Sequence, residues 1–154
     1  MHILMCNDDG ILADGLRRLA SYLSHYYRIT VVAPANEQSA KSHALTTEIP
    51  LKLDAYNGED ENPRLYALTG TPSDCMKFGL SYLLSDDMPD LVISGINHGF
   101  NLGSDVLYSG TVSAAMESCF YGIPGLALSV ERYSPERGDE MHPFIHELIE
   151  KIYV

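Results

Sequence analysis

Near its amino terminus the chain carries two short apolar segments separated by an amphipathic one, and this order limits the fold more than any other feature. His2–Cys6 and Arg28–Ala33 are apolar runs of the kind that form buried strands. Between them, Asp14–Tyr26 places its leucines on one face of a helix and its arginines on the other. A strand, a helix and a strand of these lengths form a βαβ unit, in which the strands run parallel and the crossover is right-handed.

The same alternation continues along the rest of the chain. Further strands are predicted at Leu51–Tyr56, Leu65–Leu68, Leu91–Ser94 and Gly125–Val130, and further helices from Thr71 and Pro72, at Thr111–Tyr121 and at His142–Tyr153. The polar stretch from Ala35 to Thr47 is predicted to be a functional or disordered loop, and the stretch from Glu131 to Gly138 to be mobile. The pattern predicts an α/β fold, a Rossmann-like three-layer sandwich with a mostly parallel sheet, formed as a single domain over residues 1–154.

Composition excludes several classes of partner. The 154 residues are 45% hydrophobic, which is typical of a globular domain, and they contain no apolar run of membrane-spanning length. No signal peptide is expected. The net charge of −11 argues against a nucleic-acid polymer, because binding one needs a basic surface. A small phosphorylated ligand is compatible with this charge if a metal ion and backbone amides supply a positive field. The three cysteines, Cys6, Cys75 and Cys119, are expected to be reduced core residues of a cytoplasmic protein.

Asn7-Asp8-Asp9-Gly10 follows the first predicted strand and has two explanations. Adjacent carboxylates raise each other's pKa unless a cation lies between them, and hard divalent cations prefer oxygen ligands. However, Asn, Asp and Gly are also common turn-forming residues. The motif alone does not decide between a metal site and a turn.

Residues at the ends of the other predicted strands favour a site. Ser39 follows the second strand, Thr69-Gly70-Thr71 follows the fourth, and Asn97 follows the fifth. Ligands of parallel α/β sheets bind beyond the carboxyl ends of the strands, so these residues are expected to converge with Asp8 and Asp9. Carboxylate, hydroxyl and amide oxygens together suit Mg²⁺ or Mn²⁺ and disfavour zinc.

Tyr108-Ser109-Gly110-Thr111 directly precedes a predicted helix. Unpaired backbone amides at a helix N-terminus, together with the Ser109 and Thr111 hydroxyls, would form an anion site. The same residues are also simply a good helix start. A metal site facing an anion site would be the arrangement of a phosphomonoester hydrolase, in which the ion binds a phosphate oxygen and lowers the pKa of a water molecule.

Two other phosphate-handling families fit less well. Asp-Gly after a strand resembles the haloacid-dehalogenase phosphatases, but the position of their nucleophile holds Asn7, whose amide cannot attack phosphorus. A paired acid after the first strand resembles the receiver domains of response regulators. Those domains need a phospho-accepting aspartate after a later strand, and Leu91–Ser94 leads instead into Gly95, Ile96 and Asn97.

Five motifs stand in order over residues 1 to about 130. They are Asn7-Asp8-Asp9-Gly10 with Gly15 and Leu16; Val32-Ala33-Pro34 with Gln38-Ser39 and Ser42-His43; Gly70-Thr71-Pro72 with Asp74-Cys75; Ser94-Gly95-Ile96-Asn97 with Gly99 and Asn101; and Tyr108-Ser109-Gly110-Thr111-Val112 with Ala114-Ala115. Together they closely resemble the SurE (survival protein E) family of 5′/3′-nucleotidases, and their number and order make the resemblance specific.

The resemblance implies one divalent metal ion per subunit, Mg²⁺ or Mn²⁺, held by Asp8, Asp9, Ser39 and Asn97, with the two aspartates catalytic. It implies hydrolysis of nucleoside 5′- and 3′-monophosphates to nucleoside and phosphate, some activity on short polyphosphate, a role in stress survival, and a cytoplasmic homo-oligomer, either a dimer or a tetramer. The residues expected to bind the substrate phosphate are Asn97, Ser109, Gly110 and Thr111, with Ser42 and His43 as further candidates.

The chain departs from the family pattern in its polar loop and in its length. Ala35-Asn36-Glu37 stands where an Asp-Arg pair is common, and Ala40 and Ser118 each stand where a glycine is frequent. Family members continue beyond this length with an extension that packs against a partner subunit. The chain is therefore expected to be truncated and to lack that extension.

Two questions stay open at the level of the sequence. His43 is either a general acid or base near the phosphate or a donor in a hydrogen bond that orders the loop. The protein is either a metal-dependent nucleotidase or a metal- and nucleotide-binding module without turnover. Phosphate release from nucleoside monophosphates, with the metal and with a chelator, separates these two functions.

Overall fold

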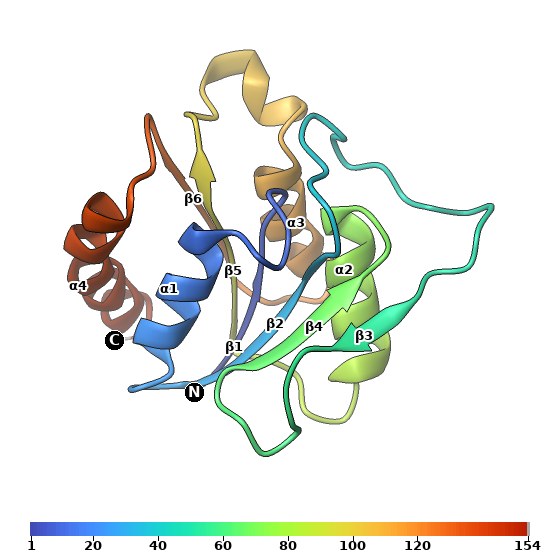
Figure 1. Cartoon of the computed structure of the whole chain (residues 1–154), viewed down its shortest axis with the longest axis horizontal. Coiled ribbons are helices and arrows are strands. Elements are labelled where there is room, and N and C mark those ends of the chain that lie inside the picture. The colour runs from blue at the N-terminus through green and yellow to red at the C-terminus, as the bar shows by residue number, and fades with distance from the viewer. Residues whose placement is uncertain (154) are drawn as a thin grey trace.

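The computed structural model describes residues 1–153, which form one six-stranded sheet with helices on both faces (Figure 1). The strands are β1 (His2–Cys6), β2 (Arg28–Pro34), β3 (Leu53–Ala55), β4 (Arg64–Leu68), β5 (Leu91–His98) and β6 (Gly125–Val130). The helices are α1 (Asp14–Leu23), α2 (Pro72–Phe78), α3 (Gly110–Cys119) and α4 (Pro135–Ile152), with a π-helical turn η1 (Gly79–Leu83) and a 3₁₀ turn η2 (Gly103–Leu107). The strand order is β3-β4-β2-β1-β5-β6, and all neighbours are parallel except β3 and β4.

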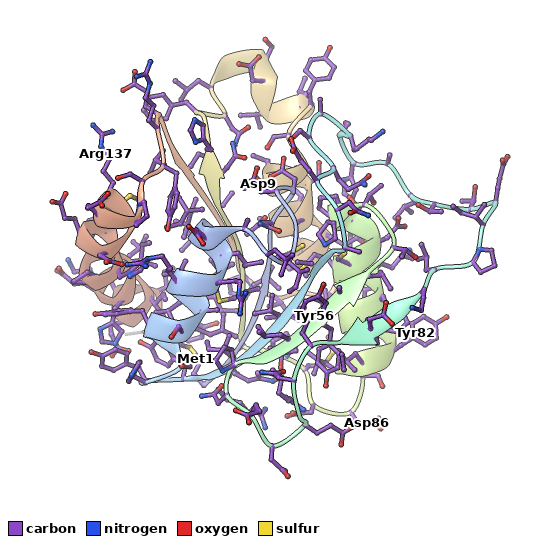
Figure 2. The ribbon with its side chains drawn as sticks, in the orientation of Figure 1. Met1, Asp9, Tyr56, Tyr82, Asp86 and Arg137 are labelled. Carbon is purple, nitrogen blue, oxygen red and sulfur yellow. The ribbon has the colours of Figure 1, made fainter. Side chains whose placement is uncertain are left out.

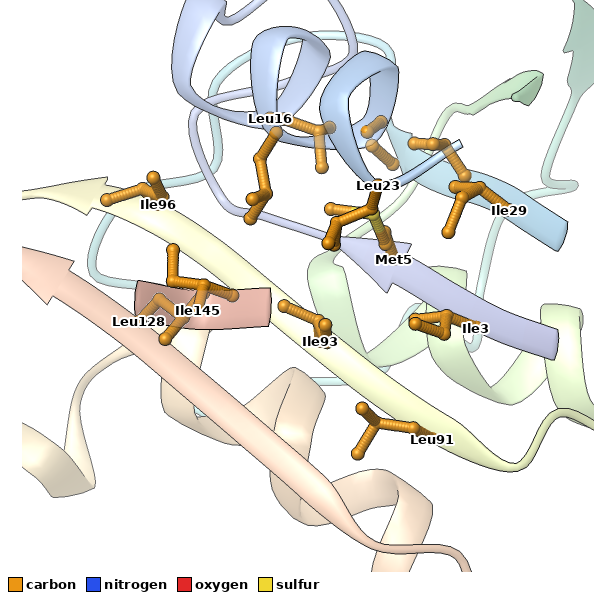
Figure 3. Close-up of a cluster of buried hydrophobic side chains, with 14 of the residues drawn as sticks. Ile3, Met5, Leu16, Leu23, Ile29, Leu91, Ile93, Ile96, Leu128 and Ile145 are labelled. Carbon is orange, nitrogen blue, oxygen red and sulfur yellow. The ribbon is translucent and has the colours of Figure 1, made fainter. Parts of the chain in front are cut away.

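Strand β1 lies in the middle of the sheet and sends apolar side chains to both faces. Ile3 and Met5 belong to the core beneath α1 and α4, which Figure 3 shows in close-up. Leu4 and Cys6 belong to the core beneath α2 and α3. A strand buried on both faces is typical of a parallel sheet covered by helices. The α/β three-layer sandwich predicted from the sequence is confirmed.

The predicted start of α2 agrees with the structure, whereas the predicted end of α1 does not. Thr71 caps α2 as predicted: its hydroxyl accepts from the Asp74 amide, and the Asp74 carboxylate accepts from the Thr71 amide. Helix α1 ends at Leu23, before the predicted limit at Tyr26, because the following residues form turns.

The amino-terminal half of α4 differs most from the sequence prediction. The sequence predicts a mobile stretch from Glu131 to Gly138 and a helix only from His142, but α4 begins at Pro135. The N-cap Ser134 followed by a proline is a helix-start signal, and this signal outweighs the polar composition of the stretch. Pro143 lies inside the helix. A proline in a helical pattern usually marks a helix boundary, so the sequence suggests a helix that starts only at His142.

Three smaller findings complete the comparison with the sequence. Strand β5 continues past the predicted limit at Ser94 to His98. Cys6 and Cys75 are buried thiols, whereas Cys119 is exposed and is not a core residue as predicted. Among residues 1–153, none of the helices combines the length and the apolar character needed to cross a membrane.

Candidate functional site

The strand order reverses beside β1, and the candidate site lies at this reversal. The chain leaves β1 toward β2 and β4 on one side, and later returns to β5 on the other side of β1. Crevices at such switch points, beyond the carboxyl ends of the strands, are where open α/β sheets bind ligands. Asp8 and Asp9 follow β1 here, and Asn97 lies in the last part of β5. Figure 2 shows Asp9 at the carboxyl end of β1.

Residues 7–10 form the turn after β1 and also carry the two adjacent carboxylates. The Asn7 side chain closes the turn, because its Nδ2 donates to the Gly10 carbonyl at 3.0 Å and its Oδ1 accepts from the Gly10 amide at 3.1 Å. The turn therefore needs Asn7 and Gly10, and the two aspartate side chains remain at its tip. Of the two alternatives that the sequence left open, the turn is present in the structure, and the metal site stays a prediction.

Burial and neighbouring negative charge both act on the two aspartates. Asp8 is only 5% exposed, and the Thr111 hydroxyl donates to its Oδ1 at 2.6 Å. Burial raises the pKa of Asp8, and the hydrogen bond from Thr111 opposes this rise. Burial also raises the pKa of Asp9, and the negative charges of Asp8 and Glu37 raise it further. A bound cation would offset both the burial and the repulsion.

A bulge between β5 and β6 positions Asn97. Ser94 pairs with Ala127, but Asn97 pairs with Ser129, so β5 carries one residue more than β6 over this interval. Gly95 lies in the bulge, and a Cβ atom there would stand 2.4 Å from the Leu128 carbonyl oxygen. Only glycine allows the two strands to approach this closely.

The Ser39 and Asn97 side chains are each oriented by one hydrogen bond. Asn97 Nδ2 donates to the Gly99 carbonyl at 2.8 Å, so its amide oxygen is the atom that could bind a cation. Ser39 Oγ donates to Glu37 Oε1 at 2.8 Å, which leaves the lone pairs of the hydroxyl for a cation. Within residues 1–153 no group of three His, Cys, Asp or Glu side chains is placed to hold a metal ion, so any ion here depends on these neutral oxygens as well.

A cavity of about 260 Å³ opens at this position. Its lining residues are Asp8, Ser39, Ala40, Asn97, His98, Asn101, Asp105, Tyr108 and Ser109. It thus brings together three of the four predicted metal ligands, all but Asp9, and two of the predicted phosphate-binding residues, Asn97 and Ser109. Asp105 had no signal of its own in the sequence.

The N-terminus of α3 packs directly on Asp8. A Cβ atom on Gly110 would stand 2.8 Å from Asp8 Cβ and 3.1 Å from Pro72 Cγ, so glycine is required by the protein's own packing. Ser109 is the N-cap of α3, and its hydroxyl accepts from the Val112 amide at 3.2 Å. The Thr111 hydroxyl donates to Asp8 and so supports the carboxylate, a role that the sequence did not predict.

Ser42 and His43 do not line this cavity, and both bind protein groups instead. Ser42 donates from its amide to the Tyr108 carbonyl at 3.1 Å and from its hydroxyl to the Leu107 carbonyl at 2.8 Å. His43 Nε2 lies 2.6 Å from Glu117 Oε2, where it donates to the carboxylate. This contact matches the loop-ordering alternative for His43.

Comparisons with known proteins identify the family of the chain. A family model described as Survival protein SurE matches residues 3–154. Two relatives named 5′-nucleotidase SurE are 49% identical (Thermoanaerobacter sp. strain X514, over 99% of this chain) and 46% identical (Thermosipho africanus, over all of it). A third, from Vibrio vulnificus, is 50% identical over 84% of this chain, and the match covers 49% of the relative's length.

The solved structures include a similar fold. The crystal structure of SurE protein from Aquifex aeolicus matches 97% of this chain with a TM-score of 0.82 and 37% sequence identity. The chain spans 60% of that structure and 60% of the Thermoanaerobacter and Thermosipho relatives. Because the family model covers nearly every residue and the fold agrees, the chain belongs to the SurE family.

Proposed function

We propose that the protein hydrolyses nucleoside 5′-monophosphates to nucleoside and phosphate with the help of one divalent cation, Mg²⁺ or Mn²⁺. The observation that carries the proposal is the packing of the α3 N-terminus against the buried carboxylate of Asp8, beside Asp9. This contact supports the proposal, because a cation held by the aspartates would then lie next to a phosphate bound at the helix N-terminus. The relatives named 5′-nucleotidase SurE support the reaction class.

The four oxygen-bearing side chains at the crevice fit a hard divalent cation. Asp8 and Asp9 supply two negative charges, and Ser39 and Asn97 supply neutral oxygens. The pKa of both carboxyls is raised, so a cation that keeps them ionised relieves an unfavourable arrangement. When bound, the ion would neutralise phosphate charge and lower the pKa of a nearby water molecule.

The protein's own groups would bind and orient the phosphate. The backbone amides of Gly110 and Thr111 lie in the first turn of α3, where helix amides have no partner within the helix. The proton of the Ser109 hydroxyl is available for a phosphate oxygen while the same oxygen accepts from Val112. Thr111 keeps Asp8 fixed by its 2.6 Å hydrogen bond. These groups bind a terminal phosphate whatever carries it, so the proposal includes nucleoside 3′-monophosphates and short polyphosphate.

Phosphate release tests the proposal. Nucleoside 5′- and 3′-monophosphates of all four bases, and tripolyphosphate, are incubated with the protein and Mg²⁺, Mn²⁺ or a chelator. We expect release that depends on the metal and that Asp8→Asn removes. If calorimetry shows that the protein binds Mn²⁺ and a nucleotide but releases no phosphate, the protein is a binding module and the hydrolase proposal is wrong.

A further inference from the structure

Two buried carboxylates outside the cavity have no part in the proposed reaction. Asp74 on α2 and Glu117 on α3 are each only 4% exposed. A buried carboxylate is unfavourable unless polar partners compensate for its lost hydration. In both cases a partner comes from the same segment, the loop of residues 35–47, which we call the Ser39 loop.

Asp74 holds the end of the Ser39 loop. Its Oδ1 accepts from the Thr46 amide at 3.0 Å, and its Oδ2 accepts from the Thr46 hydroxyl at 2.6 Å. The neighbouring Thr71 hydroxyl donates to the Ala44 carbonyl at 2.6 Å. Asp74 also accepts from the Thr71 amide as part of the α2 cap, so one carboxylate joins the loop to the start of a helix.

Glu117 holds the middle of the Ser39 loop through His43. The 2.6 Å contact between His43 Nε2 and Glu117 Oε2 joins the loop to α3, more than one helical turn after the N-terminus of that helix. A hydrogen bond to an ionised carboxylate is stronger than one between neutral groups. Ser42, the preceding residue, is bonded to the Leu107 and Tyr108 carbonyls.

These bonds matter because the Ser39 loop has no other regular support. Residues 35–52 contain neither helix nor strand. Ala40 and Ser42 adopt positive φ angles of 57° and 54°, which non-glycine residues keep only where surrounding contacts hold them. Just before Ser39, the Gln38 amide donates to the Asp8 carbonyl at 2.7 Å. Ser39 therefore lies on a short span between this bond and the bonds of Ser42 and His43.

We propose that Asp74 and Glu117 are positioning residues that keep the Ser39 loop against the crevice and thereby set the affinity for the divalent cation. The inference rests on the proposed function, because Ser39 acts as a ligand only if a cation binds there. Asp8, Asp9 and Asn97 are placed by strands, so Ser39 is the one ligand whose position depends on side-chain bonds far from the ion.

The test uses two variants that each loosen one bond, with a neighbouring control for each. Thr46→Val removes the hydroxyl bond to Asp74 but leaves the α2 cap intact, and Thr47→Val alters the adjacent exposed residue. Glu117→Gln removes the charge opposite His43, and Ser118→Ala removes a buried hydroxyl that bonds only within α3, to the Ala115 carbonyl. Amide hydrogen exchange of residues 36–46 is measured without metal, and Mn²⁺ affinity is measured by calorimetry.

We expect exchange in the Ser39 loop to quicken by about threefold to tenfold in Thr46→Val and Glu117→Gln, the range that follows from the loss or weakening of one hydrogen bond. Mn²⁺ affinity should fall by up to roughly 10-fold, because these bonds act only through Ser39 and cannot cost more than the loss of that ligand itself. The two controls should match the wild type in both measurements. Because His43 acts through Glu117, His43→Ala should lower Mn²⁺ affinity in the wild type and much less in Glu117→Gln.

Three results would separate the proposals. Unchanged exchange in both variants, with normal Mn²⁺ binding by the wild type, overturns the positioning role. Faster exchange with unchanged Mn²⁺ affinity also overturns it, because the loop would then not set the site. A wild-type protein that binds neither Mn²⁺ nor Mg²⁺ overturns the proposed function. In that case, faster exchange in the variants would still show that Asp74 and Glu117 stabilise the Ser39 loop.

Discussion

The two sides of the candidate site are built in different ways. The sheet side consists of Asp8, Asp9 and Asn97, at the ends of the central strands β1 and β5. The loop side consists of Ser39, which is exposed and bonds to Glu37 in its own segment. The sheet side cannot shift without disturbing two apolar cores, whereas the loop side can shift by losing a few hydrogen bonds.

This difference divides the expected effects of substitutions. A neutral intramolecular hydrogen bond contributes about 0.5–1.5 kcal/mol, which is much less than the free energy needed to move a strand within a close-packed core. The sheet side carries both negative charges, and the loop side contributes a neutral ligand. Sheet-side changes should therefore abolish the reaction, and loop-side changes should weaken binding of the ion.

The largest effect is expected for Asp8→Asn and Asp9→Asn. Each removes half of the negative charge that would hold the cation, so phosphate release should fall on the order of 10³-fold or more. The fold should persist, because the asparagine at position 8 still accepts from Thr111. Steady-state kinetics and circular dichroism check both statements. Near-normal metal-dependent hydrolysis in either variant would remove that aspartate from the set of ligands.

Gly110→Val should damage the sheet side from the helix that packs on it. The new side chain would begin 2.8 Å from Asp8 Cβ, and overpacking of this kind costs about 1–3 kcal/mol of stability. A displacement of Asp8 by about 1 Å would lower turnover by roughly 100-fold. Mn²⁺ affinity should fall too, which calorimetry measures. Gly58→Val, in an open loop, is the control, and equal losses in both variants would contradict the packing argument.

Ser109→Ala should affect the reaction more than the binding of the ion. Loss of a hydroxyl that donates to the phosphate should raise the barrier by roughly 2–4 kcal/mol, mainly through kcat. Loss of the N-cap bond should lower stability by about 1 kcal/mol. Ser134→Ala removes the N-cap of α4, away from the site, and should show only the second effect. Wild-type kinetics in Ser109→Ala would place the phosphate elsewhere.

Much of the fold could be predicted because its signals are local. The strands β1, β2 and β6 follow from short apolar runs, and the start of α2 follows from Thr71 and its proline. Glycine interrupts the pattern of β5, so its last residues were not predicted as strand, although they carry Asn97. The start of α4 was missed because its polar first turn has no apolar stripe.

Without the family resemblance, the site could be predicted only as a list of strand ends and one helix start. Parallel strands place their carboxyl ends at one edge, and this rule brings Asp8 near Asn97 without further information. The bond from Thr111 to Asp8 spans 103 residues, and the contact of His43 with Glu117 spans 74. Contacts of such separation depend on how whole layers pack, so no local pattern reveals them.

A smaller effect is expected on the loop side. Ser39→Ala should weaken Mn²⁺ binding by roughly 10-fold, because water can replace one neutral ligand. Glu37→Gln should also weaken it, because it changes the group that orients the Ser39 hydroxyl and removes a negative charge near Asp8 and Asp9. Kinetics at saturating metal should return near-normal kcat for both variants. If Ser39→Ala abolishes turnover even at saturating Mn²⁺, the two sides are not distinct in the way described above.

The smallest effect is the pH dependence of stability without metal. Burial raises the pKa of Asp8 in the folded protein, so the folded state holds this proton more tightly than the unfolded chain does. Folding therefore loses stability as pH rises from about 4, the unfolded value, through the raised pKa, by about 1.4 kcal/mol for each unit of elevation. Asp8→Asn has no proton to lose.

The variant should therefore be level with the wild type near pH 4 and more stable than it at neutral pH. Urea unfolding in chelator at several pH values measures the difference. Asp60→Asn, at an exposed position, controls for the loss of one negative charge. With Mn²⁺ present the order should reverse, because the ion stabilises only the form with both carboxylates. If the difference in the free energy of unfolding between Asp8→Asn and the wild type did not change with pH, ionised Asp8 would not destabilise the folded protein, and a cation would have no such cost to offset.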